Sequence, residues 1–133
     1  MNCLFCGHTT QVTNSRSRSH TVWRRRSCRE DHTFTTYETV DTAQITVRKR
    51  DNNLQPLQTT KILLSLAKSG VSHDSAVSLE RTIRNKLMDS LITRADANEL
   101  TTEQIDAIAY QTLSAYDQRY GDRYRSYSDQ QLA

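Results

Sequence analysis

The chain has 133 residues, a formal net charge of +3 and 35% hydrophobic residues. No run approaches the roughly 18 apolar residues that a membrane helix needs, and no apolar leader is found near the N-terminus. These features argue against a membrane-spanning or secreted protein, so we expect a soluble cytoplasmic protein with no membrane partner. The charge is uneven, because residues 1–50 carry nine Lys and Arg against four Asp and Glu, whereas residues 51–133 carry nine against eleven. This asymmetry predicts a basic N-terminal module attached to a weakly acidic body.

A Cys-x-x-Cys motif stands at the start of the chain, where Cys3 and Cys6 are followed by Gly7. Glycine lets the backbone turn tightly around paired thiolates, as one half of a zinc ribbon requires. Three cysteines cannot pair fully, and in a reducing compartment such a motif is more often a metal site or a redox motif than a disulfide. No thioredoxin-like strand precedes the motif, which disfavours the redox interpretation. We therefore expect a bound ion, with Zn²⁺ as the default.

Cys28 supplies a third donor, and the fourth donor is left open between two residues. His32 completes a Cys-x3-His pair, whereas Asp31 offers a harder oxygen and is the second choice. His8 is too close to the first pair to wrap around the ion, and His20 lies between the two halves of the site. Ordinary thiols and a surface histidine are the alternative, but a segment this short would then have little to order it. The predicted metal ligands are Cys3, Cys6, Cys28 and His32.

Three short β-prone runs, at residues 11–13, 21–23 and 33–37, predict the strands of a small ribbon. Arginines on and beside these runs would decorate one sheet, where guanidinium groups suit phosphates and guanine edges, and Trp23 could shield the apolar side. A charged run is usually only a solvated face, so the arginines gain their weight from the adjoining metal motif. The predicted DNA-binding residues are Arg16, Arg18, Arg24, Arg25 and Arg26.

The body begins with a predicted β-hairpin formed by residues 45–47 and 54–57. Its first strand runs into a group of cations that includes Lys49 and Arg50, and Lys61 follows on the next predicted helix. Three charges at these positions could converge on one polyphosphate. Taken alone, such generic residues are more simply interpreted as solvated cations.

Apolar residues then recur at spacings of three and four, which predicts three or four helices packed behind the hairpin. The first helix has a predicted cap at Thr59 or Thr60 and ends before Gly70, and the third begins with a capping box formed by Thr101 and Gln104. A tyrosine stripe near the C-terminus is more often core or subunit interface than a base-stacking wall. The predicted fold class is α+β, with a small β-rich N-terminal ribbon followed by a mostly α-helical domain that has a small hairpin or sheet.

Motifs typical of catalysis are not found in the body. Its few glycines form neither a Walker nor a Rossmann loop, no Ser-His-Asp arrangement occurs, and the one histidine of the body, His73, lies near a predicted helix start. We therefore expect a protein that is not an enzyme.

The order of motifs along nearly the whole chain carries a further signal. The segments concerned are Cys3–Gly7, Asn14–Arg16, Arg24–Cys28, Phe34–Glu38, Val47–Arg50, Pro56, Lys61 and Ala115–Arg125. Together they resemble the NrdR family, the bacterial repressors of ribonucleotide reductase operons. The most specific parts of this resemblance are the Arg-Arg-Arg-x-Cys and Phe-Thr-Thr-Tyr-Glu segments and the spacing from Lys49 through Pro56 to Lys61.

The resemblance implies a zinc-ribbon DNA-binding domain over residues 1–44 and an ATP-cone domain for nucleotide binding and oligomerisation over residues 45–133. ATP or dATP would act as an allosteric ligand that selects among homo-oligomers (dimers, tetramers or larger) and so controls binding to double-stranded promoter DNA. By position, the nucleotide-binding residues implied by the resemblance are Val47, Arg48, Lys49, Arg50, Lys61, Tyr116 and Tyr124.

The chain departs from the family pattern in several places. Asp31 occupies the usual position of a second-knuckle cysteine, and that segment is one residue shorter. Gln55 and Leu57 replace the usual Glu and Phe, and Gly121 stands where alanine is usual. An alternative function is a zinc-dependent, nucleotide-sensing adaptor that binds a protein partner and never touches DNA.

Overall fold

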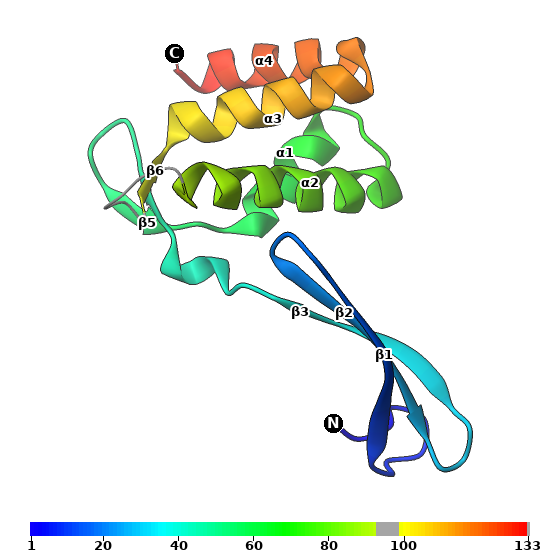
Figure 1. The fold of residues 1–133 in the computed structure, drawn as a ribbon. Helices are drawn as coiled ribbons and strands as arrows, with labels where there is room; N and C mark the ends of the chain where they lie inside the picture. The colour runs from blue at the N-terminus through cyan, green and yellow to red at the C-terminus, as the bar shows by residue number, and fades with distance from the viewer. Residues whose placement is uncertain (93–98, 133) are drawn as a thin grey trace. The chain divides into compact units, whose positions relative to one another are not determined.

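The computed structural model describes residues 1–92 and 99–132, and the chain divides into two compact units, Met1–Asp41 and Thr42–Ala133 (Figure 1). The first unit is a β-sheet and the second is mostly helical with a small mixed sheet. The predicted α+β class, with a β-rich ribbon followed by a helical domain, is confirmed. The two units are called the ribbon unit and the cone unit below.

The ribbon unit is an antiparallel sheet of three strands in the order β1 (Thr10–Arg18), β2 (Thr21–Cys28) and β3 (Thr33–Thr39). The three strands lie where the β-prone runs predicted them and extend beyond those runs. Both connecting turns contain a residue with positive φ, Ser19 at 52° and Asp31 at 61°. Asp and Ser tolerate such turns because their short polar side chains bond locally.

The described residues of the cone unit form one short 3-10 helix, three short strands and four α-helices. In chain order these are η1 (Thr42–Gln44), β4 (Thr46–Arg48), β5 (Leu54–Pro56), α1 (Thr59–Lys68), α2 (His73–Ile92), β6 (Glu99–Thr101), α3 (Thr102–Tyr116) and α4 (Gln118–Leu132). The predicted hairpin is the antiparallel β4–β5 pair. Strand β6 was not predicted, and it joins the other side of β4 as a parallel neighbour.

Two of the predicted helix ends are confirmed and one is wrong. Thr101 and Gln104 form the predicted capping box, with Thr101 Oγ1 accepting from the Gln104 amide at 3.2 Å and Gln104 Oε1 accepting from the Thr101 amide at 2.9 Å. Gly70 lies just past α1 with φ of 93°, as expected for a C′ glycine. The cap predicted at Thr59 or Thr60 is wrong, because α1 begins one residue earlier, after Gln58, whose side chain makes no capping bond.

A continuous apolar core holds the cone unit together. Helices α3 and α4 lie side by side, α2 packs on α3, and α1 packs on α2 (Figure 1). The largest fully buried apolar side chains lie on α1, α2, β6 and α3, and they are Leu66, Ile83, Leu87, Leu100 and Leu113. Leu100 belongs to β6, which explains why this short strand is fixed beside β4. Among the described residues, no helix is both long and apolar enough to span a membrane.

Candidate functional site

The first half of the predicted metal site is a tight N-terminal turn. The Gly7 amide donates to the Cys3 carbonyl at 2.9 Å, and the Cys3 amide donates to the His8 carbonyl at 2.7 Å. Gly7 has φ of 77°, a conformation in which a side chain would be strained. This turn folds the chain back so that the thiols of Cys3 and Cys6 point to the same side.

The second half is the turn between β2 and β3. Cys28 is the last residue of β2, and its amide donates to the His32 carbonyl at 3.1 Å, while the Asp31 amide donates to the Cys28 carbonyl at 3.1 Å. The left-handed conformation of Asp31 closes this turn and leaves the Asp31 side chain exposed. His32, the next residue, is half-buried and faces the cysteines.

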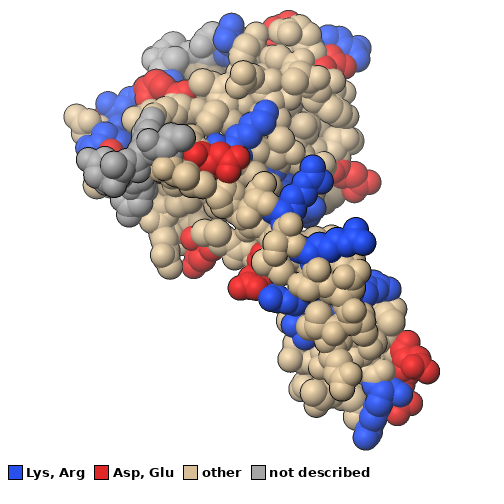
Figure 2. Space-filling view, in the orientation of Figure 1, with Lys and Arg blue, Asp and Glu red and all other residues tan. Residues whose placement is uncertain are grey.

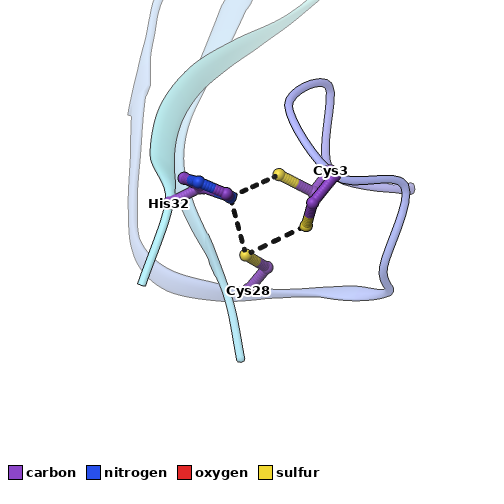
Figure 3. A group of neighbouring side chains, drawn as sticks. Cys3, Cys28 and His32 are labelled. Atoms are coloured by element: carbon purple, nitrogen blue, oxygen red, sulfur yellow. Dashed lines mark hydrogen bonds between the residues drawn. The ribbon is translucent and has the colours of Figure 1, made fainter. Parts of the chain in front are cut away.

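Side chains from both halves point toward one another, so that their donor atoms surround a common point (Figure 3). One atom from each of Cys3, Cys6, Cys28 and His32 lies within 4.8 Å of every other. His32 Nδ1 is 3.6 Å from Cys28 Sγ and 3.8 Å from Cys3 Sγ, and the Cys6 and Cys28 sulfurs are 3.7 Å apart. Zn²⁺ with ordinary bond lengths to sulfur and nitrogen requires tetrahedron edges of about 3.5–3.8 Å. The three measured distances match these edges and the donor set suits Zn²⁺; of the two candidates for the fourth donor, His32 and not Asp31 belongs to the group.

His8 lies outside this donor group but contacts it. Its Nδ1 is 3.2 Å from Cys6 Sγ, and its Nε2 is 2.6 Å from the Nη2 atom of Arg29. A guanidinium only donates, so Nε2 accepts from Arg29 and Nδ1 carries the proton that it donates to the sulfur. Arg29 and His8 thus form a relay that stabilises negative charge on Cys6, as outer-shell partners of metal ligands do. His8 is not a member of the donor group, as its closeness to Cys6 predicts, but the sequence does not predict this supporting contact.

Two of the thiols have pKa values shifted in opposite directions. Burial opposes ionisation of Cys3, but hydrogen bonds from the Phe5 and Cys6 amides and from the adjacent thiols together lower the pKa of Cys3. The His8 amide favours the Cys6 thiolate, yet burial and the nearby sulfurs of Cys28 and Cys3 raise the pKa of Cys6. Sulfurs this close repel one another as thiolates, and a cation among them removes that penalty.

The five predicted DNA-binding arginines lie on one sheet but on two faces of it. Cross-strand partners project to the same face. Arg16 pairs with Trp23, and Trp23 pairs with Tyr37, so these three residues share a face. Arg25 lies two residues after Trp23 on β2 and therefore projects to the same face. This face, the open face, carries Arg16, Arg18, Trp23, Arg25 and Tyr37. The opposite face, the core face, carries Arg24, Arg26, Cys28, Phe34 and Glu38.

Trp23 does not shield the apolar side of the sheet as the sequence had suggested, since Phe34 and the buried Cys28 are on the opposite face. The ribbon unit contains arginine but no lysine, and its basic side chains lie at several places along it in Figure 2.

The cone unit contains a cavity of about 270 Å³ between the small sheet and helices α1, α3 and α4. Of the residues that the structure describes, four cations and one carboxylate line it, namely Lys49, Arg50, Lys61, Lys68 and Asp106. Apolar side chains from β4, α1 and α3 line another part of the cavity, including Val47, Ile62 and Ala109. A cationic rim beside an apolar wall suits a ligand with both a polyphosphate and a flat apolar part.

Asp106 connects three elements at one side of the cavity. Its carboxylate accepts from Tyr124 Oη at 2.8 Å and from Ser128 Oγ at 3.1 Å, and Arg50 Nη2 lies 3.5 Å away. Arg50 also donates to the Glu103 carboxylate at 3.1 Å. The pKa of Glu103 is lowered first by a hydrogen bond from its own backbone amide and then by this contact with Arg50. Burial, followed by the Asp106 charge, raises the pKa of Tyr124, which keeps it a neutral donor. The cation and the tyrosine are therefore held at fixed positions.

Comparison with known proteins agrees with both units. A family model described as the N-terminal domain of NrdR-like transcriptional repressors matches residues 1–38, and the ATP cone domain matches residues 45–132. Transcriptional repressor NrdR of Bordetella avium is 34% identical over 97% of this chain and 85% of its own length. The NrdR repressor of Lachnoclostridium phytofermentans is 32% identical over 97% of this chain and 89% of its own length. The chain belongs to the NrdR family of transcriptional repressors.

The resemblance predicted from the motifs is thereby confirmed, and the NrdR assignment gives the cavity its context. Of the nucleotide-binding residues that were predicted, the cavity lining includes Val47, Lys49, Arg50, Lys61 and Tyr124. Arg48 and Tyr116 are not among the described residues that line it. Arg48 donates to Glu99, the first residue of β6, and Tyr116 donates to Ser75 at 3.1 Å.

Sequence reasoning missed several residues of the cavity in this NrdR-family chain. Lys68 donates to the Tyr127 hydroxyl at 2.6 Å, and both line the cavity with Asp106 and Ser128. The tyrosine stripe gave a signal for Tyr127. Asp106 gave none, because an acidic residue on an amphipathic helix is ordinarily interpreted as solvated.

Gly121, where the NrdR family usually has alanine, lies at the contact between α3 and α4. A Cβ at this position would be 3.1 Å from the Ser114 Cα and closer still to the Ser114 hydroxyl. The glycine therefore permits a close approach of two helices that both contribute to the cavity.

Proposed function

We propose that this chain represses ribonucleotide reductase operons by binding their promoter DNA, and that ATP or dATP in the cone cavity controls this binding. The observation that carries the proposal is the order of the two matched domains, an NrdR-type ribbon followed by an ATP cone, in a chain related to named repressors over 97% of its length. Residues 1–44 would provide the DNA contacts, and residues 45–133 would bind nucleotide and form homo-oligomers. Such a repressor acts in the cytoplasm, where bacterial DNA lies.

Zn²⁺ in this proposal has a structural role. Cys3, Cys6, Cys28 and His32 would hold the ion, which would join the N-terminal turn to the β2–β3 turn. The bound ion supplies no chemistry other than fixing these two turns. The ribbon needs such a link, because its buried cluster of Cys3, Cys28 and Phe34 is small.

The cone cavity is the proposed site for the regulatory nucleotide. Lys49, Arg50 and Lys61 would bind the polyphosphate. The charges of the described lining residues sum to +3, from four cations and one carboxylate. Lys49 is half-buried and its ammonium has no side-chain partner among the described residues, so it is available to a phosphate. The nucleotide acts as a ligand in this proposal, and we expect no turnover.

Coupling between nucleotide and DNA would run through the oligomer. A single ribbon is small and makes few contacts, so two or more ribbons at a fixed separation are needed for tight binding to paired sites. A nucleotide that favours one oligomer, whether a dimer, a tetramer or a larger assembly, would change that separation and therefore the DNA affinity.

The proposal is tested by fluorescence anisotropy with a duplex that contains paired repeats from upstream of a ribonucleotide reductase gene. Binding is measured with ATP, with dATP and with neither, over a range of salt concentrations, against a shuffled duplex. We expect promoter affinity that depends on the nucleotide and falls steeply with salt. Identical curves for all nucleotide conditions contradict the regulatory part of the proposal. No binding to any duplex favours the protein-binding adaptor instead.

A matched pair of variants tests the cavity. Lys61→Ala removes a cation from the cavity lining, whereas Arg119→Ala removes an arginine that is 78% exposed and does not line it. We expect Lys61→Ala to weaken nucleotide binding about tenfold or more, because hydrogen bonds to charged groups contribute about 1.5–3 kcal/mol. Arg119→Ala should bind like the wild type. Equal losses for the two variants contradict this cavity as the nucleotide site.

A further inference from the structure

The two faces of the ribbon sheet differ in charge. The strand residues of the open face include three arginines and no carboxylate, and all of these residues lie within the described part of the chain. The core face carries two arginines, and Glu38 offsets one of them. The open face therefore has a strand charge of +3 and the core face +1. A polyanion is attracted more strongly to the open face.

The arginines of the core face are engaged in contacts within the sheet. Arg24 Nη1 donates to Glu38 at 2.7 Å, and Arg26 Nε donates to the Thr36 hydroxyl at 3.2 Å. On the same face Phe34 and the metal-site cysteines are buried together. To bind a phosphate, Arg24 would have to give up its carboxylate partner. This face is therefore better suited to holding the ribbon together than to binding a new ligand.

On the open face, Arg25 is held in place by two hydroxyls. Its Nη1 donates to Thr35 Oγ1 at 3.0 Å, and its Nη2 donates to Thr33 Oγ1 at 2.8 Å. Each hydroxyl accepts from Arg25, so its own proton remains available to donate to another acceptor. One positive charge and two hydroxyl donors are thereby fixed side by side. Phosphate oxygens are bound by this combination in protein–DNA complexes, and a preset guanidinium loses less entropy on binding.

The rest of the open face extends this arrangement along β1 and β3. Arg16 lies opposite Trp23, and Trp23 lies opposite Tyr37, which is 54% exposed. Rings with a polar edge, flanked by cations, suit a surface that contacts sugar and phosphate.

We propose that the open face is the surface through which the ribbon contacts DNA, with Arg25, Thr33 and Thr35 forming a phosphate site and Arg16 and Arg18 extending it. Arg24 and Arg26 serve the fold of the ribbon instead. The inference rests on the proposed DNA binding and divides the five arginines into two classes. Side-chain alternation along β2 separates Arg25 from Arg24 and Arg26, and the pairing of β1 with β2 places Arg16 and Arg18 on the face of Arg25.

The test compares neighbouring arginines of β2, because each substitution removes the same charge from the same strand. Zinc-loaded full-length Arg25→Ala, Arg24→Ala and Arg26→Ala are titrated with the promoter duplex under the nucleotide condition that gives the tightest wild-type binding. We expect Arg25→Ala to weaken binding about tenfold or more and to lower the slope of log affinity against log salt by about 0.9 for each phosphate that is no longer neutralised. Arg24→Ala and Arg26→Ala should stay within about threefold of the wild type once zinc content is matched.

A second variant covers the case in which Arg25→Ala fails to fold. Thr33→Val with Thr35→Val keeps the size and β-branching of both side chains, removes the two hydroxyl donors and leaves every charge in place. We expect this double variant to bind DNA several-fold more weakly with normal zinc content. Losses in Arg24→Ala and Arg26→Ala equal to that of Arg25→Ala, or a valine double variant that binds like the wild type, overturn the inference while DNA binding itself stands. A wild type that binds no duplex overturns the proposed function as well.

Discussion

The ribbon unit and the cone unit are stabilised by different means. In the ribbon the buried cluster consists of Cys3, Cys28 and Phe34, and two of these three residues also belong to the candidate metal-ligand group. In the cone, fifteen buried side chains of the described residues form one apolar core. Binding of Zn²⁺, as proposed above, would therefore complete the core of the ribbon, whereas the described core of the cone consists of packed apolar and aromatic side chains. From this difference we expect the ribbon, with its proposed DNA contacts, and the cone, with its proposed nucleotide site, to lose stability independently.

Removing the metal is the largest perturbation that separates the two units. A structural Zn²⁺ site contributes about 10–16 kcal/mol of binding free energy to folding, so chelation or Cys28→Ser should disorder the ribbon. The chain has one tryptophan, Trp23 in β2, whereas the helices belong to the cone. We expect a large change in Trp23 fluorescence and little change in the helical circular dichroism at 222 nm. Ser27→Ala, a neighbouring substitution in β2, should leave both signals unchanged.

Lowering the pH should destabilise the ribbon, as removal of the metal does. The pKa of Cys6 is raised by burial and by the adjacent sulfurs, although the His8 amide opposes this. Protons therefore compete with the ion for this thiolate more strongly as the pH falls, and zinc affinity should decrease with decreasing pH. Titration with a chromophoric chelator at several pH values measures this effect. Loss of the helical signal together with the Trp23 signal contradicts the independence of the two units.

The converse experiment weakens the cone and leaves the ribbon intact. Leu113 on α3 is fully buried, and Leu113→Ala should lower the free energy of unfolding of the cone by about 2–5 kcal/mol. Urea titration followed at 222 nm measures this loss, while zinc content and Trp23 fluorescence in the absence of urea should not change. Val77→Ala on α2, at a side chain that is 36% exposed, is the control and should stay within about 0.5 kcal/mol of the wild type.

How far sequence could predict this protein also differs between the two units. In the ribbon, the metal donors follow from thiol chemistry and short spacing, and the structure brings all four together. Alternation along β2 separates Arg25 from Arg24 and Arg26, but the sequence could not place Arg16 and Arg18, because their faces depend on the register in which β1 pairs with β2. That register includes an irregularity between Val12 and Asn14, which no residue pattern specifies.

In the cone, two of the three predicted helix ends were correct, whereas contacts between distant parts of the chain were missed. The capping box at Thr101 and the glycine at position 70 depend only on neighbouring residues. Strand β6 forms only because Leu100 is buried beside β4, more than fifty positions earlier in the chain. Asp106 was likewise missed, since its partners Tyr124 and Ser128 come from the next helix. The resemblance to the NrdR family selected five residues that line the cavity, and three of them, Lys49, Arg50 and Lys61, were also expected from the residues alone as cations that could converge on a polyphosphate.

A smaller perturbation of the ribbon tests the relay behind Cys6. His8→Ala removes the proton donor to Cys6 and the acceptor for Arg29 but leaves all four donor atoms in place. Loss of such an outer-shell partner typically costs tenfold to a hundredfold in metal affinity, that is about 1.4–2.7 kcal/mol. Competition with a chelator measures the affinity, and His20→Ala in the β1–β2 turn is the control. Equal zinc affinities for the two variants contradict a supporting role for His8.

The smallest effect expected distinguishes a true helix cap in the cone from an apparent one. Thr101→Ala removes the hydroxyl that accepts from the Gln104 amide, and the loss of such a cap costs about 1 kcal/mol. Thr60→Ala changes the same residue type at a position where sequence suggested a cap, but α1 begins before it and its side chain is exposed. Alanine has the higher helix propensity, so Thr60→Ala should be neutral or slightly stabilising.

Urea titration at 222 nm should separate the two variants while Trp23 fluorescence and zinc content stay constant. A loss at position 60 equal to that at position 101 contradicts the observed start of α1, and a change in zinc content of either variant contradicts the independence of the two units.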